Sequence, residues 1–269
     1  MSRPTDPALH LLPRYDRGAT GLHLAIVVHP DGLAWSAHDR ADGRCLCLAQ
    51  GRGTTWPAEE RLPLEPATVS FCALPELSTL VPESTLRPGT EAGHLSLVHG
   101  PLPTGLLRDE PVEDLGARCV YLHDEGMEHR VLERFPAAQA VALRSLLVRG
   151  ALACGRQGAA VVAHRVGKRM DVAVADAQGL KLSNAYHCTT GTDALYYLLH
   201  LLDALRLEPA AVAVRWGGPA WAGADLELLK RYLPTAAPVL TSADPMLAGL
   251  ETAAPETWWA LLEQAGCAS

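Results

Sequence analysis

The sequence has few aromatic residues, no long apolar run and no cluster of basic residues. With only two Phe among 269 residues, a core has to be built from aliphatic side chains. Hydrophobic residues still make up 48% and charged residues 20%, which predicts a folded chain rather than a disordered one. The lack of about 20 consecutive apolar residues predicts no membrane span, and the first ten residues lack a signal-peptide pattern. We therefore expect a cytoplasmic protein.

The charge balance argues against a nucleic-acid partner. The formal net charge is −7, and the densest basic run, Arg165 to Arg169, falls at an expected hairpin turn. Binding to phosphates requires clustered Lys and Arg, so we expect no nucleic acid. The seven Cys are odd in number and scattered, which is typical of free thiols in a reducing compartment.

Motifs that identify common enzyme sites are also missing. The sequence has no G-x-S-x-G elbow, Walker loop or G-x-G-x-x-G, and Cys45 and Cys47 have no second Cys pair at zinc-like spacing. The densest group of ligand-type side chains is His123, Asp124, Glu125, Glu128 and His129. Its two His are six residues apart, outside the i, i+4 register of a helical zinc site, so we expect exposed residues between a strand and a helix and no metal.

The first half of the chain predicts a meander followed by mixed elements. Residues 1–20 are polar and predict a loose leader, and two apolar runs then meet at Pro30-Asp31-Gly32, where Asp-Gly is typical of a hairpin turn. A third strand is expected over 44–49, another over 68–73, and an irregular insertion over 78–116 with one candidate strand at 95–99. Beyond it the pattern predicts strands over 119–124 and 138–143 and helices over 127–135 and 145–154.

The second half repeats this order more clearly. Three strands joined by Gly-containing turns precede a helix over 190–206, in which Thr190 and Asp193 have capping-box spacing. A strand over 211–216, a helix over 224–232, a short strand over 238–240 and a helix over 255–264 follow. The order βββαβαβα, found twice, predicts an α/β protein with two lobes, over residues 21–157 and 158–269, each with a mixed sheet opened by a three-strand meander.

Two resemblances arise from these residues. The duplicated βββαβαβ lobes resemble the actin, Hsp70 and sugar-kinase superfamily, whose ribonuclease H-like lobes bind ATP between them. The segments STLVPESTL, LKLSNAYHCTTGTDALYYLLHLLDALRLEP and DLELLKRYL resemble an uncharacterised family known from Bacteroidota, domain of unknown function 3822. The family resemblance covers nearly the whole chain. It implies the actin-like fold and brings no activity with it.

The superfamily resemblance also implies where a nucleotide would bind. A strand that ends in Gly-Gly-small residue lets adenosine approach the backbone, and Gly217, Gly218 and Ala220 match this pattern. A plain strand-to-helix turn explains the same glycines. Gly167 and Lys168, at the second hairpin turn, are candidates for binding phosphate, and the free N–H groups at Thr190 favour an anion.

The acidic residues that the superfamily uses to position Mg²⁺ are replaced in both hairpins. His29 and His164 stand where a carboxylate is expected, and a neutral imidazole is a poor substitute in an oxygen-ligand shell. Asp31 and Asp171 lie close by in the sequence, and they leave open an enzyme with unusual metal ligands. Two missing carboxylates nevertheless argue against phosphoryl transfer.

The leading hypothesis is therefore a non-catalytic actin-like protein that binds or scaffolds a protein partner. It names no catalytic residue and no metal, and ATP is the candidate cofactor. The alternatives are an ATP-dependent phosphotransferase or ATPase and a filament or assembly component. A homodimer is a further alternative for the partner.

Overall fold

The computed structural model describes residues 8–252 and 254–267, which form two compact units. The N-terminal unit comprises residues 8–143, 242–252 and 260–267. The C-terminal unit comprises residues 144–241 and 254–259. Helix α3 (Leu143–Gly155) thus lies almost entirely in the C-terminal unit. The lobe boundary near residue 157 stays a prediction.

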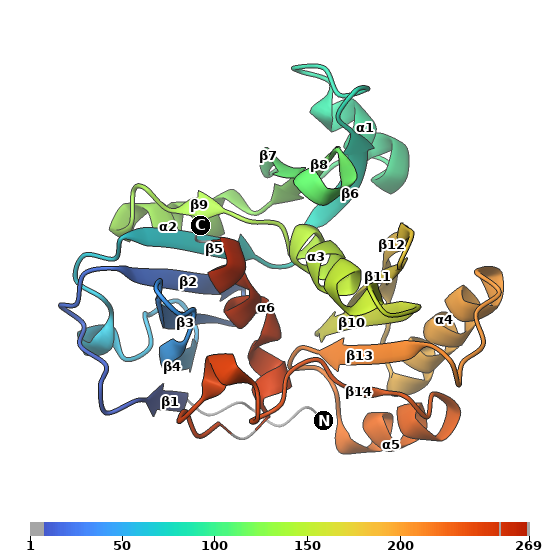
Figure 1. Cartoon of the computed structure of the whole chain (residues 1–269). Helices are drawn as coiled ribbons and strands as arrows, with labels where there is room; N and C mark the ends of the chain where they lie inside the picture. The colour runs from blue at the N-terminus through green and yellow to red at the C-terminus, as the bar shows by residue number, and fades with distance from the viewer. Residues whose placement is uncertain (1–7, 253, 268–269) are drawn as a thin grey trace. The chain divides into compact units, whose positions relative to one another are not determined.

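The N-terminal unit contains a six-stranded mixed sheet in the order β1-β4-β3-β2-β5-β9 (Figure 1). Strands β2, β3 and β4 form the expected antiparallel meander, and β5 and β9 continue the sheet in parallel with β2. The bounds are β1 (Ala8–Leu11), β2 (Leu22–His29), β3 (Gly32–Asp39), β4 (Cys45–Arg52), β5 (Thr68–Ala73) and β9 (Gln139–Ala140). Helix α2 (Glu125–Arg134) packs against this sheet through Met127 and Val131.

Part of the segment expected to be a loose leader forms a strand, β1. Residues 1–7 of that leader lie outside the described residues, but residues 8–11 pair with β4 in antiparallel fashion, from Ala8 opposite Gln50 to Leu11 opposite Cys47. The edge of the meander offers unpaired backbone groups, and an extended segment satisfies them whatever its own strand propensity.

The insertion between β5 and α2 is also more regular than expected. It forms a three-stranded sheet in the order β6-β8-β7, and one helix, α1, contacts that sheet. The bounds are β6 (Leu77–Pro82), α1 (Glu91–His99), β7 (Leu106–Val112) and β8 (Ala117–His123). The strand expected at 95–99 is wrong, because Leu95 is the buried contact of a helix against Val81, Val120 and Leu122. A short apolar run fits either element, and packing decides between them.

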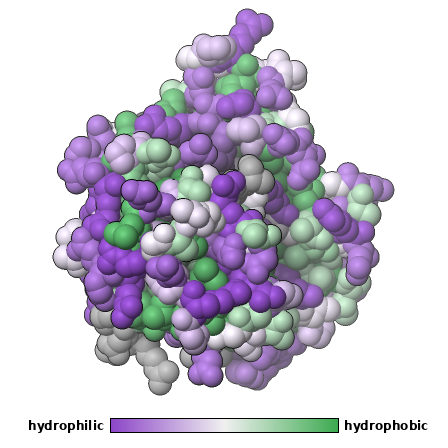
Figure 2. Space-filling model, turned by 60° about the vertical axis from the view of Figure 1, so that its left-hand side comes forward, coloured by the Kyte–Doolittle hydropathy of each residue, from purple (hydrophilic) through white to green (hydrophobic). Residues whose placement is uncertain are grey.

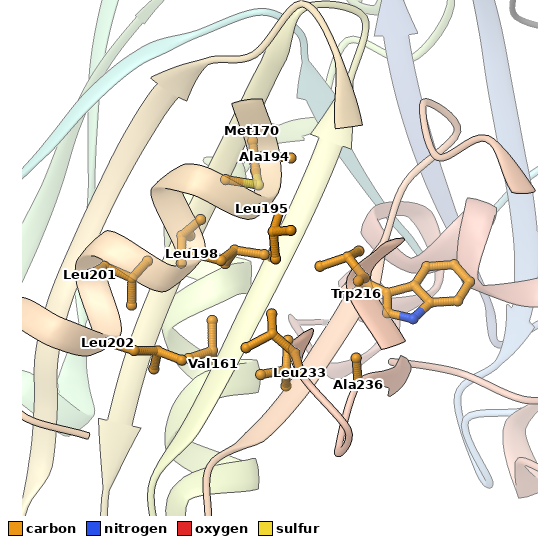
Figure 3. Packing of buried hydrophobic residues seen from close by; sticks show 14 of the residues in the cluster. Val161, Met170, Ala194, Leu195, Leu198, Leu201, Leu202, Trp216, Leu233 and Ala236 are labelled. Carbon is orange, nitrogen blue, oxygen red and sulfur yellow. The ribbon is translucent and has the colours of Figure 1, made fainter. Parts of the chain in front are cut away.

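The C-terminal unit contains a five-stranded sheet in the order β12-β11-β10-β13-β14. Its bounds are β10 (Ala160–Val166), β11 (Arg169–Asp176), β12 (Gly179–His187), β13 (Ala213–Gly217), β14 (Ala237–Pro238), α4 (Gly191–Ala204), α5 (Gly223–Tyr232) and α6 (Trp259–Leu262). Helix α4 packs Leu195, Leu198 and Leu202 against Val161 and Met170 of the sheet (Figure 3). This aliphatic core fits the scarcity of aromatic residues.

The two sheets have the same topology. In each, three antiparallel strands are followed by two parallel ones, so β2-β3-β4-β5-β9 corresponds to β10-β11-β12-β13-β14. The duplicated α/β fold predicted from the sequence is thus confirmed.

No helix in the described part of the chain has both the length and the apolar composition to cross a bilayer. On the face seen in Figure 2, hydrophilic residues predominate and hydrophobic ones are scattered among them.

Candidate functional site

The candidate site lies at the C-terminal ends of β10 and β13, where two adjacent parallel strands stop and their loops diverge. His164 of β10 is paired in register with Gly217 of β13, and the two strands run in the same direction. Loops that follow neighbouring parallel strands meet at one edge of a sheet, which is where open α/β folds bind ligands. The residues around this edge therefore decide what the C-terminal unit can bind.

The glycines at the end of β13 are required by contacts with the protein's own chain. Gly218 has φ +96°, and a Cβ there would lie 2.5 Å from the carbonyl oxygen and 2.9 Å from the nitrogen of Arg165. A Cβ on Gly217 would lie 2.9 Å from Cγ1 of Val239. The N–H of Ala220 donates to the Arg165 carbonyl at 3.1 Å. Close packing of this turn thus accounts for both glycines without a ligand.

A partly buried ion pair lies directly beside this turn. Arg165, which is 4% exposed, donates from Nη1 to Oδ2 of Asp225 at 2.8 Å. Its guanidinium lies 5.5 Å from the ring of Trp221, whose indole N–H donates to the Gly217 carbonyl at 2.8 Å. The basic run Arg165 to Arg169 was expected at a hairpin turn, but Arg165 lies within β10, because that strand extends to Val166.

The turn of the second hairpin consists of Gly167 and Lys168, as predicted. Gly167 has φ +56°, the left-handed conformation that favours glycine in a two-residue hairpin turn, and both residues are exposed. The carbonyl of Lys168 accepts from the N–H of Cys188 at 2.7 Å, which ties the turn to the segment after β12.

Asp171, the alternative metal ligand in this hairpin, already has a cationic partner. It lies opposite His164 in the β10–β11 ladder, and its carboxylate accepts from Arg169 through Nε at 2.8 Å and Nη2 at 2.6 Å. Burial lowers the pKa of His164 to about 4, against a smaller opposing effect of Asp171, so the imidazole is neutral at pH 7. A neutral His and a paired carboxylate make a poor Mg²⁺ site.

The first hairpin turns one residue earlier than the Asp-Gly signal suggested. The turn residues are Pro30 and Asp31, and Gly32 is already the first residue of β3 without a positive φ. The glycine is needed for another reason: a Cβ at Gly32 would lie 2.5 Å from the carbonyl oxygen of Gly51 in β4. Asp31 points into solvent with its side chain 91% exposed, 3.5 Å from Nδ1 of His29.

The start of α4 is occupied by the protein's own carboxylates. Thr190 and Asp193 form the predicted capping box: the Thr190 N–H donates to Oδ2 of Asp193 at 2.8 Å, and the Asp193 N–H donates to Oγ1 of Thr190 at 3.1 Å. Gly191 follows, and a side chain there would collide with the carboxylate of Asp225. The carboxylates of Asp193 and Asp225 interact favourably with the dipole at the N-terminus of α4, and their negative charge repels a further anion.

The ligand-type group around His123 is structural rather than exposed. His123 and Glu128 are each 3% exposed, with Nε2 and Oε2 2.7 Å apart, and Arg108 donates to the other oxygen of Glu128 at 2.5 Å. Asp124 caps α2 by accepting from the Met127 N–H at 2.9 Å. The expected exposure is therefore wrong for His123 and Glu128. Across the described residues, His, Cys, Asp and Glu side chains form no group suited to a metal ion.

The structure places the sequence-predicted residues in three neighbouring places within the C-terminal unit. Gly218 and Ala220 contact the Arg165 backbone and Gly217 packs against Val239. Gly167 and Lys168 form the turn after Arg165, and Thr190 begins the helix whose Gly191 lies against Asp225. Sequence reasoning missed the Arg165–Asp225 pair and Trp221. The local sequence signal was the position of Asp225 three residues after Ala222, a spacing typical of a helix start. Asp225 indeed accepts from the Ala222 N–H at 3.3 Å.

A family model described as "Protein of unknown function (DUF3822)" matches residues 67–235. No curated protein matches the chain significantly. Among solved structures, a Bacteroides thetaiotaomicron protein described as having an actin-like ATPase fold and unknown function aligns with a TM-score of 0.69. The two are 14% identical, over 80% of this chain and 90% of that one.

A second solved structure, the PilM-PilN type IV pilus biogenesis complex, aligns with a TM-score of 0.52. Its identity is 13%, over 91% of this chain and 98% of that one. Identities this low show the fold alone. The actin-like fold predicted from the sequence is thereby confirmed.

Proposed function

We propose that this chain, which belongs to the DUF3822 family of proteins of unknown function, is a non-catalytic actin-like protein that binds or scaffolds a protein partner. One observation carries the proposal: three carboxylates near the ends of β10 and β13 are held by the protein itself. Asp225 pairs with Arg165, Asp171 pairs with Arg169, and Asp193 caps α4.

Phosphoryl transfer by this fold needs Mg²⁺ and charges aimed at the transferring group. A carboxylate that already pairs with an arginine has to lose that partner before it binds a metal, and the buried Arg165 would then remain unpaired, which costs several kcal/mol. Imidazoles at His29 and His164 do not replace the missing oxygens. Turnover of ATP is therefore unfavourable at this site.

Weak nucleotide binding without turnover is compatible with this function. Gly217, Gly218 and Ala220 would then contact the base and sugar, and Gly167 and Lys168 would lie toward the phosphates. Thr190 begins a helix whose own carboxylates repel an anion, so it would contribute least. The partner, in this proposal, is a protein in the cytoplasm. A solved structure of the same fold is described as a complex, which favours a binding role over a catalytic one.

Titration calorimetry with ATP and Mg²⁺, together with a phosphate-release assay, tests this proposal. We expect no turnover, and the same result for the wild type and for Asp171→Ala. Magnesium-dependent hydrolysis that Asp171→Ala abolishes and Asp176→Ala preserves would refute it, since Asp176 lies at the far end of the same strand in a pair with Lys181.

A further inference from the structure

The duplicated sheets differ at one position. In the N-terminal unit the third meander strand, β4, is covered by β1, which adds to its outer edge in antiparallel fashion. In the C-terminal unit the equivalent strand, β12, is the outermost strand of the sheet, and within the described residues no strand adds to it. The same edge of the same fold thus carries an added strand in one unit and none in the other.

The two equivalent strands also differ in how far their residues are buried. The first five residues of β4, Cys45 to Ala49, are all buried, whereas none of the nine residues of β12 is. Long edge strands are usually shortened, bulged or charged, because they offer unpaired N–H and C=O groups to other chains. Strand β12 carries one charged residue, Lys181, near its start, and the segment from Leu182 to Tyr186 carries none. This segment is suited to pairing with an extended peptide, which would replace the bond that the Ala185 N–H makes to Oδ1 of Asn184 at 2.9 Å.

An aromatic cluster lies beside the open edge. Tyr186 of β12 stacks on Tyr197 of α4 with ring centroids 4.5 Å apart, and Tyr196 continues the cluster at 5.4 Å from Tyr197. Tyr196 is 62% exposed and stacks on the exposed His200 at 6.0 Å. Exposed tyrosines supply contact area at a low entropic cost, and they are enriched at binding surfaces.

The charged side chains at the β12 edge favour one kind of binding partner over another. Strand β12 has no carboxylate and one cation, Lys181, which pairs with Asp176 of β11 at 3.1 Å, and the turn beside its other end exposes Lys168. A second copy of β12 would bring these cations toward each other, whereas an acidic segment would be attracted. We infer that the β12 edge binds an extended acidic peptide of a partner protein as an added antiparallel strand, with apolar side chains on the Tyr186–Tyr197–Tyr196 cluster. This rests on the proposed binding function and names its surface.

The test uses the full chain and a fluorescent heptapeptide of alternating Val and Glu, with a Val and Lys heptapeptide as the charge control. We expect saturable binding of the acidic peptide and none of the basic one. Tyr196→Ala and Lys181→Glu should each weaken binding by about tenfold. Their matched controls on α5, Tyr232→Ala and Lys230→Glu, should leave it unchanged, since Tyr232 is 50% exposed and Lys230 is also exposed.

Hydrogen exchange reports the backbone pairing itself. Amides between Leu180 and Tyr186 should slow on binding, and light scattering should show one chain per complex. Absence of binding at about 1 mM peptide, protection elsewhere, or dimerisation through β12 would each overturn the inference. Nucleotide turnover is measured separately, so hydrolysis of ATP with intact peptide binding would refute the non-catalytic function and leave the β12 site standing.

Discussion

Arg165, which is buried, and Asp225, whose side chain is 21% exposed, form an ion pair between β10 and the first turn of α5, with Nη1 and Oδ2 2.8 Å apart. The pair joins two elements sixty residues apart in the sequence at the edge where related folds would admit a ligand. The guanidinium is also covered by Trp221, so it has little access to water. This arrangement serves the stability of the C-terminal unit and gives each charge a partner within that unit.

Removal of Asp225 should therefore be costly. Asp225→Ala leaves a buried guanidinium without its partner and deletes the acceptor for the Ala222 N–H, and we expect a loss of about 3–5 kcal/mol in the free energy of unfolding. Asp176→Ala removes only the surface partner of Lys181 and should cost about 0–1 kcal/mol. Urea denaturation of both variants measures the difference, and equal costs would contradict the structural role of the pair.

Stability should fall in mild acid because three buried imidazoles are held neutral. Burial lowers the pKa of His23 to about 4, of His38 to about 3 and of His164 to about 4. The unfolded chain takes up these protons near pH 6.5 and the folded chain does not, so stability is complete above pH 6.5 and decreases as the pH falls toward 4. Between pH 7.5 and 5 each imidazole accounts for about 2 kcal/mol.

Urea midpoints measured across this range test the effect. His38→Asn, which removes a titrating group bonded to Ser36 at 2.7 Å, should flatten the pH dependence of stability. His129→Gln alters a side chain that is 73% exposed and should leave the dependence unchanged. A stability that does not change between pH 7.5 and 5 would show that the folded protein accepts these protons.

Much of the fold was predictable because its strongest signals are local. Apolar runs separated by Gly-containing turns identified both meanders, and Thr190 with Asp193 marked the start of α4 three residues apart. Strand β1 and helix α1 were missed, since each depends on a neighbour: β1 on the edge of β4, and α1 on the insertion sheet that buries Leu95.

The candidate site was less predictable, for a related reason. Gly217 and Gly218 fit a ligand turn and a packed turn equally well in sequence. The positions of Val239 beside Gly217 and of the Arg165 backbone beside Gly218 separate the two explanations. The ion pairs of Arg165 with Asp225 and of Arg108 with Glu128 join residues from different elements. No periodicity or spacing in the sequence predicts an ion pair between residues of different elements. His123 and Glu128 looked like solvent-exposed residues because their burial depends on contacts with each other and with Arg108 of β7, which lies about twenty residues earlier in the sequence.

Gly218 provides a direct test of the packed turn. Gly218→Ala places a Cβ 2.5 Å from the Arg165 carbonyl oxygen at φ +96°, and we expect a loss of about 3 kcal/mol or more in stability. Gly223 has open space around its Cβ position and begins α5, so Gly223→Ala should be neutral or stabilise by up to about 1 kcal/mol. Thermal unfolding of both variants gives the comparison, and a Gly218→Ala protein as stable as the wild type would mean that this turn is loosely packed.

Two glutamates on α2 test whether the insertion is held to the rest of the N-terminal unit by charge. Glu128 is buried; its desolvation raises the pKa, but hydrogen bonds from Arg108 and His123 outweigh this and lower it overall, so the carboxylate is ionised at pH 7. Glu133 lies on the same helix, 66% exposed, and pairs with His129. Glu128→Ala leaves Arg108 and the buried His123 without their acceptor and should lower the free energy of unfolding by about 2–4 kcal/mol, whereas Glu133→Ala should lower it by less than about 0.5 kcal/mol.

Hydrogen exchange should also become faster in β7 and β8 of the Glu128→Ala protein, because those strands carry Arg108 and His123. Unchanged exchange in both strands would mean that other contacts, such as the hydrogen bond from the Ala142 N–H to Oε1 of Glu110 at 3.0 Å, hold the insertion in place instead of this triad.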